Sequence, residues 1–126
     1  MSRSSLYIFV FYALVVLLLL FLPLDGLGSF MRIKLFGWIR LGYLLHVAAF
    51  IPLIPLWKQN WPRHAMWMIL LAGLVIAALL EGIHYVLPYR NFDVYDLWAN
   101  MTGVAIGFGV TGLFGPGPGG IRAAGA

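Results

Sequence analysis

Ionisable and amide side chains gather in one short part of this otherwise apolar chain. Glu81 and His84 lie three residues apart, so they would share one face of a helix. Beyond a short polar loop, polar or small residues recur every three or four positions, as on one helix face, at Asp93, Asp96, Asn100, Gly103 and Gly107. Ionisable groups within hydrophobic segments are costly, so this clustering indicates either a structural network or a binding site.

Three interpretations are open for this polar cluster, which comprises Arg40, His46, Glu81, His84, Arg90, Asp93, Asp96 and Asn100. The first is a structural network, in which Arg40 pairs with Glu81 and the other side chains exchange hydrogen bonds between helices. The second is a polar pocket that binds an anionic or lipid-linked ligand, with Arg40 and Arg90 as hydrogen-bond donors. The third is a metal site built on Glu81-x-x-His84, which is the spacing of carboxylate-bridged helix bundles.

The metal site is the least favoured of these three interpretations. The chain has no second copy of the Glu-x-x-His motif, and only His46 and Asp96 could complete the ligand set. We therefore expect neither a metal nor another cofactor. No serine or cysteine near the cluster could act as a nucleophile, although Glu81 and His84 could serve as acid and base on a lipid-linked substrate. We favour a protein without catalytic activity and assign no catalytic residue.

The composition places these residues in a membrane protein. Hydrophobic residues make up 63% of the 126 residues, charged residues make up 10%, and the mean hydropathy is +0.95. Soluble domains carry about 25% charged residues. The net charge of +4 is spread over loops and termini without a basic run, so we expect membrane lipids as partners and no nucleic acid.

Four apolar runs predict an all-α membrane protein with four transmembrane helices in a compact bundle, because about 20 residues cross a bilayer. The expected spans are 6–24, 35–57, 66–87 and 94–114, and a tail rich in glycine and proline follows at 115–126. The first run is longer than the apolar core of a signal peptide and lacks an A-x-A-like cleavage site, so we expect a retained helix. Pro52 and Pro55 should kink the second span.

Local signals position the cluster within these spans. Asp93 is a predicted N-cap of the fourth helix, and Asp96 three residues later gives a variant of the capping box. The Gly103-x-x-x-Gly107 pattern predicts close helix packing within the bundle. At about 1.5 Å per helical residue, Arg40 and Glu81 reach the same depth, so we expect them to meet in the bundle interior.

The distribution of basic residues gives a weak orientation. Four spans place both termini on one side, where Arg3, Lys58, Arg63 and Arg122 would also lie. An excess of Lys and Arg favours the cytoplasm. We therefore expect cytoplasmic termini and a polar cluster in the outer leaflet.

The same residues resemble the VanZ-like family of membrane proteins. The family signature is similar to Glu81 followed by Pro88-x-Arg90-x-x-Asp93-x-x-Asp96-x-x-x-Asn100-x-x-Gly103-x-x-x-Gly107. His46 followed by Phe50 is similar to the family's helix with a central histidine, and the resemblance covers residues 37–112. His84 departs from the pattern, because the family usually has glutamine at this place.

The resemblance implies a small protein of the bacterial inner membrane that acts in envelope or glycopeptide-related physiology through a lipid-linked ligand. An alternative is an accessory subunit of a larger membrane complex, for example an energy-transducing one, which would pack other membrane chains against its helices and tail. Ile121 is the one large apolar residue of the tail. Ordering this tail therefore requires an outside contact, and we expect Ile121 or Arg122 to touch another chain or a lipid.

Overall fold

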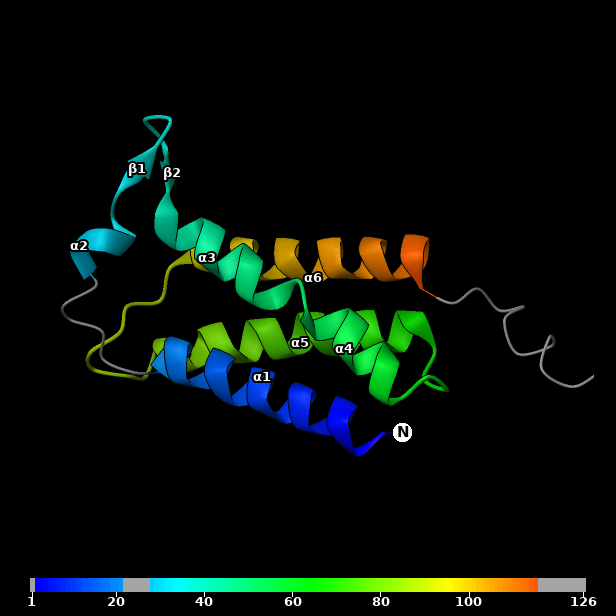
Figure 1. Cartoon of the computed structure of the whole chain (residues 1–126). Helices are drawn as coiled ribbons and strands as arrows, with labels where there is room; N and C mark the ends of the chain where they lie inside the picture. Colours follow the sequence, from blue (N-terminus) through cyan, green and yellow to red (C-terminus); the bar gives the residue numbers. More distant parts are fainter. Residues whose placement is uncertain (1, 22–27, 116–126) are drawn as a thin grey trace, which may run out of the picture.

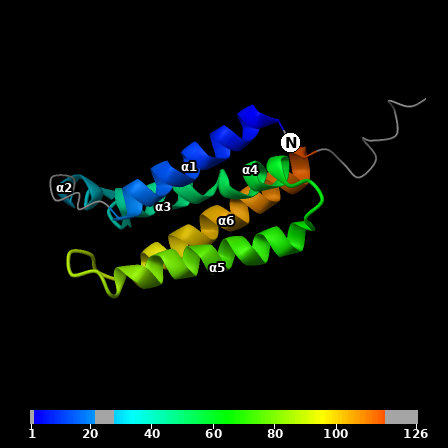
Figure 2. The same ribbon diagram turned by 90° about the horizontal axis from the view of Figure 1, so that it is seen from below.

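The computed structural model describes residues 2–21 and 28–115, and the expected tail contacts of Ile121 and Arg122 lie outside these residues. The elements in chain order are α1 (Arg3–Phe21), α2 (Gly28–Met31), β1 (Lys34–Leu35), β2 (Ile39–Arg40), α3 (Leu41–Phe50), α4 (Leu53–Asn60), α5 (Met66–His84) and α6 (Val94–Phe114). Figures 1 and 2 show the long helices side by side along a common direction.

The described helices include four that are long and apolar enough to cross a membrane: Arg3–Phe21, Leu41–Asn60, Met66–His84 and Val94–Phe114. The second of these joins α3 to α4. The predicted all-α membrane bundle is therefore confirmed. Both ribbon views place the start of α1 and the end of α6 at the same end of the bundle, as four crossings require.

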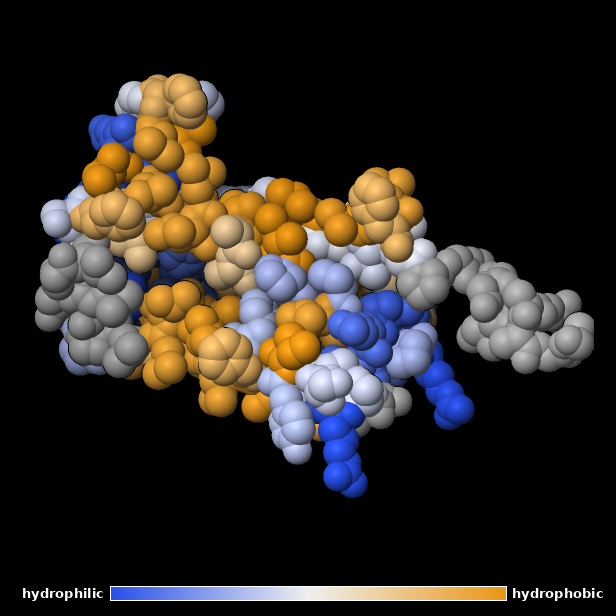
Figure 3. Space-filling view, viewed as in Figure 1, coloured by the Kyte–Doolittle hydropathy of each residue, from blue (hydrophilic) through white to orange (hydrophobic). Residues whose placement is uncertain are grey.

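The surface of the bundle is largely apolar. Large side chains that a soluble protein would bury are open to the surroundings, among them Phe11 at 70% and Leu79 at 62% exposed. On the face drawn in Figure 3, apolar residues in orange cover much of the surface, and hydrophilic residues in blue gather towards the right-hand end. Such a surface is typical of a protein surrounded by lipid, because the hydrocarbon chains of the bilayer cover the apolar side chains that face outwards.

The second span begins later than the sequence indicates, because residues 34–40 form a hairpin instead of helix. Lys34 pairs with Arg40 and Leu35 with Ile39 in antiparallel register. The turn between them has positive φ at Phe36 (54°) and at Gly37 (83°), a conformation that glycine adopts readily. The expected start at residue 35 is therefore wrong, since a continuous apolar run does not distinguish a short strand from a helix end.

The predicted kink in the second span is confirmed, since α3 ends at Phe50 and α4 begins at Leu53. Prolines have no N–H to donate, so Pro55 cannot bond to the carbonyl of Ile51 four residues earlier. The hydroxyl of Tyr12 on α1 donates to the carbonyl oxygen of Ala49 at 2.5 Å, beside the break. The kink thus exposes backbone acceptors of α3 to neighbouring helices.

Helices α3 and α6 touch through their backbones at two glycines. A Cβ atom added at Gly103 would lie 2.4 Å from the carbonyl oxygen of Val47, and one at Gly107 would lie 2.3 Å from that of Ile51. Neither position has room for a side chain. The predicted close packing at Gly103-x-x-x-Gly107 is therefore confirmed, with the proline-freed carbonyl of Ile51 at one of the two contacts.

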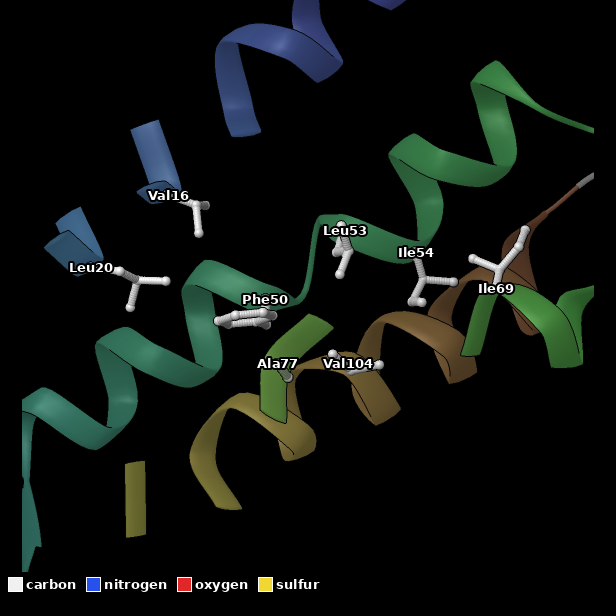
Figure 4. Close-up of a cluster of buried hydrophobic side chains, with 8 residues drawn as sticks. All are labelled: Val16, Leu20, Phe50, Leu53, Ile54, Ile69, Ala77 and Val104. Carbon is white, nitrogen blue, oxygen red and sulfur yellow. The ribbon is translucent and has the colours of Figure 1, made fainter. Parts of the chain in front are cut away.

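The apolar core lies between all the long helices (Figure 4). Phe50, Ile54, Ile69, Ala77 and Val104 are each at most 1% exposed. Val16, Leu20 and Leu53 complete the cluster. These side chains come from α1, α3, α4, α5 and α6, so one apolar core joins all the helices that carry the polar cluster.

The fourth span begins where the sequence predicts, at Asp93. Its Oδ1 accepts a hydrogen bond from the amide of Tyr95 at 2.8 Å, which confirms it as the N-cap of α6. The amide of Asp93 itself donates to Oε1 of Glu81 at 3.4 Å. Glu81 of α5 thus takes the place that Asp96 would have in the predicted capping-box variant.

We expect Gly107→Ala to destabilise the bundle by about 1–3 kcal/mol, because the added methyl group overlaps the Ile51 carbonyl and the helices must separate. Thermal unfolding in detergent, followed by circular dichroism, measures the effect. Gly109→Ala is the matched control, since its Cβ would meet open space within the same helix. Equal stability of the two variants would contradict the backbone contact.

We expect Asp93→Ala to loosen the first turn of α6 by about 1 kcal/mol, since the amide of Tyr95 loses its acceptor. Hydrogen exchange at the Tyr95 amide measures this opening. Asp93→Asn keeps a capping oxygen and should protect that amide nearly as well as the original residue. Equal protection in both variants would show that the cap contributes little.

Candidate functional site

Helices α3 and α6 bring together three polar side chains next to their backbone contact. Nδ1 of His46 lies 2.8 Å from Oδ1 of Asn100, and Nε2 of His46 lies 3.8 Å from Oδ2 of Asp96. His46 directly precedes Val47, whose carbonyl touches Gly103, and Asn100 is one turn before Gly103. The close packing of the two helices therefore sets the distance between these side chains.

A second group lies deeper, where α5 ends. Glu81 is 0% exposed, and its Oε1 lies 3.3 Å from Nδ1 of His84, whose side chain is 3% exposed. Nε2 of His84 lies 3.0 Å from the carbonyl oxygen of Leu20, which can only accept, so Nε2 carries a proton. A proton shared between Nδ1 and Oε1 of Glu81 would leave this buried pair with no net charge and avoid a large desolvation penalty.

Polar side chains from the end of α5 and from the α5–α6 connection satisfy the last carbonyl groups of α1. His84 serves Leu20, the hydroxyl of Tyr89 donates to Phe21 at 3.1 Å, and Nη2 of Arg90 donates to Leu19 at 3.1 Å. The last four carbonyls of a helix have no partner within it, and a cation is favoured at this end of the helix dipole. The role of Tyr89 was not predicted, because nothing in the sequence connects it to a helix 68 residues away.

Arg40 does not reach Glu81, so the predicted pair in the bundle interior is wrong. Arg40 lies on β2, its side chain is 48% exposed, and its Nη1 lies 3.8 Å from Oδ2 of Asp93. The guanidinium also lies 5.7 Å from the centre of the Tyr43 ring. The hairpin holds Arg40 at the end of the bundle, where it keeps its hydration instead of meeting the desolvation cost of a buried ion pair.

These residues surround a hollow of about 390 Å³ at the hairpin end of the bundle. Of the predicted residues, Arg40, His46, Arg90, Asp93 and Asp96 line it, whereas Glu81, His84 and Asn100 lie behind its wall. The structure adds residues that sequence reasoning did not single out, namely Gly28, Met31, Arg32, Gly42, Tyr43, Tyr89 and Asn91. The charge of Arg32 was a signal in the sequence, but only the fold brings the segment from Gly28 to Arg32 to the same hollow as Asp93 and Asp96 of the α6 start.

A second hollow, of about 380 Å³, lies at the opposite end between α4 and α6. Most of its lining is apolar, including Pro55, Val110 and Phe114. Its charged residue, Lys58, already donates to the carbonyls of Pro62 and His64 at 2.7 and 2.8 Å. This hollow therefore has fewer polar groups available for a ligand than the hollow at the hairpin end.

The metal interpretation receives no support from the geometry. Within residues 2–21 and 28–115, no three His, Cys, Asp or Glu side chains come together as a set of metal ligands. Glu81 and His84 pair with each other, while His46 and Asp96 lie 3.8 Å apart on the hollow and away from that pair. The arrangement suits hydrogen bonding to a polar ligand better than coordination of a cation.

Comparison with known proteins agrees with this architecture. The chain matches the VanZ/LLP1 family over residues 9–115, which include most of α1, the other three helices that are long and apolar enough to cross a membrane, and every residue of the polar cluster. No curated protein and no solved structure matches it. The match covers most of the sequence and extends the resemblance seen around the Pro88–Gly107 motif to α1. The chain is a member of the VanZ/LLP1 family of membrane proteins.

Proposed function

We propose that this protein binds the phosphate-bearing head group of a lipid or lipid-linked molecule in the hollow, without carrying out chemistry on it. The observation that supports this most is the concentration of three arginines, Arg32, Arg40 and Arg90, around one hollow at the end of the membrane helices. Arginine presents a planar fork of donors that matches phosphate oxygens, and head groups lie at this depth in a bilayer.

The arginines differ in how readily they could turn to a ligand. Arg90 is oriented by its bond to Leu19, so it contributes a fixed positive charge. Arg40 contacts Asp93 at 3.8 Å with almost half of its side chain exposed, and such a pair is worth at most about 1 kcal/mol. Arg40 can therefore exchange a weak contact for a stronger one with phosphate, while the exposed Arg32 needs no rearrangement of the bundle.

We further propose that the protein resides in the bacterial inner membrane with both termini in the cytoplasm. The hollow would then open on the outer face, where lipid-linked envelope precursors and glycopeptides occur. This orientation rests on the slight excess of Lys and Arg at the end that carries the termini, and on family membership for the cell envelope.

Single-cysteine labelling tests the orientation, because the chain has no cysteine of its own. In whole cells, a membrane-impermeant maleimide should label a cysteine at Asn91, on the hollow, but not one at Ser2 or Gln59. Labelling all three in permeabilised cells is the control for reactivity. The opposite pattern, or labelling of Asn91 and Ser2 from the same side, would overturn the proposed topology.

Lipid binding tests the proposed site. We expect the double variant Arg32→Gln/Arg40→Gln to bind phosphatidylglycerol roughly tenfold more weakly in a native mass spectrometry titration, since it loses charge-assisted hydrogen bonds to phosphate. Arg63→Gln removes an exposed arginine from the opposite end and should bind as the unchanged protein does. Equal binding by all three proteins would refute the site, and a protein that co-purifies in stoichiometric amount would then favour the accessory-subunit alternative.

A further inference from the structure

We propose that the hollow selects head groups that carry a primary ammonium beside their phosphate, and that Asp96 and Nε2 of His46 accept hydrogen bonds from this ammonium. The inference rests on the proposed function and specifies which lipids it concerns. It follows from the contact between His46 and Asn100, from the position of Asp96 beside His46, and from the opposite charges of the described residues around the hollow.

The bond to Asn100 determines where His46 carries its proton. Oδ1 of Asn100 is an acceptor and lies 2.8 Å from Nδ1 of His46, so Nδ1 donates. In the neutral ring, Nε2 then has a lone pair and no hydrogen. Nε2 lies 3.8 Å from Oδ2 of Asp96, and both residues line the hollow.

Asp96 offers a second hydrogen-bond acceptor at the same place. Its Oδ2 lies 3.8 Å from Nε2 of His46, which is too long for a hydrogen bond. In the described parts of the chain no other side chain or amide donates to this carboxylate, which is 23% exposed. With a neutral His46 ring, two acceptors therefore face each other across 3.8 Å with no hydrogen between them.

A primary ammonium fits this pair of acceptors. Its nitrogen can lie about 2.8–3.0 Å from both Oδ2 and Nε2 when these atoms are 3.8 Å apart, with one N–H directed at each. A quaternary ammonium has no N–H and cannot make either bond. The geometry thus distinguishes an ethanolamine-type head group from a choline-type one of the same charge.

The charges around the hollow give an independent reason. Arg40 and Asp93 offset each other, and Arg90 is directed to the carbonyl end of α1. Among the described residues that line the hollow, Arg32 and Asp96 add one positive and one negative side chain. A zwitterion with phosphate near Arg32 and ammonium near Asp96 complements both charges, whereas a purely anionic head group complements one.

The decisive experiment compares two lipids with identical acyl chains on the same purified protein. In native mass spectrometry titrations, the unchanged protein should bind phosphatidylethanolamine roughly tenfold more tightly than phosphatidylcholine, since two hydrogen bonds to charged groups distinguish them. Asp96→Asn should reduce this ratio to about two or less, while Asp96→Glu, which keeps the charge, should restore part of it. Unfolding temperatures of each variant establish that the bundle is intact.

Arg32→Gln separates the two proposals. It should weaken binding of both lipids by the same factor and leave their ratio unchanged, because both carry the phosphate. Equal affinity of the unchanged protein for the two lipids, or a preference that Asp96→Asn does not reduce, overturns the ammonium inference while the phosphate site stands. If substitution of Arg32 and Arg40 changes the binding of neither lipid, both the proposed phosphate site and the ammonium inference fail.

A soluble competitor identifies the source of the head group. Displacement of bound phosphatidylethanolamine by glycerophosphoethanolamine, but not by glycerophosphocholine, would support the same recognition by a free polar ligand. Failure of both to compete, with the lipid preference retained, would assign the site to an intact lipid whose acyl chains lie along the helices.

Discussion

The contact between the backbones of α3 and α6 is the constraint on which the rest of the structure depends. Two carbonyl oxygens of α3 lie against α6 at Gly103 and Gly107, where no side chain fits. In a bilayer, apolar surface gains little from leaving lipid, so helices associate through close packing and polar contacts. The same stripe of α6 that permits this approach carries Asn100 and Asp96 towards His46. Packing and site therefore share one face of one helix.

Proline and glycine act together across this contact. Pro55 deprives the carbonyl of Ile51 of its helical donor, and that carbonyl is the one that meets Gly107. An unbonded carbonyl directed into hydrocarbon would be costly, whereas against a glycine backbone it lies close to Cα–H groups that can act as weak donors. The kink and the small-residue pattern are thus two parts of a single packing solution.

The sequence predicts features that depend on neighbours along the chain. Apolar runs locate the spans, and the N-cap at Asp93 and the close approach at Gly103 follow from local residue types. It fails where a partner comes from far away. Arg40 lies within an apolar run but belongs to a hairpin, and its partner is Asp93 rather than Glu81 of matched depth. No periodic pattern in the sequence indicates the contacts of Tyr89 and Arg90 with α1. The same holds for the contribution of α2 to the hollow.

The capping of α1 from a distance has a consequence for how the protein is made. α1 leaves the ribosome before the other three long helices, and its terminal carbonyls at Leu19, Leu20 and Phe21 acquire these partners only when residues 84–90 have been synthesised. Until α5 is inserted, the end of α1 must stay hydrated near the interface or be shielded by the insertion machinery. Among the four long helices, α1 is therefore synthesised first but is one of the last to have its terminal carbonyls hydrogen-bonded within the protein.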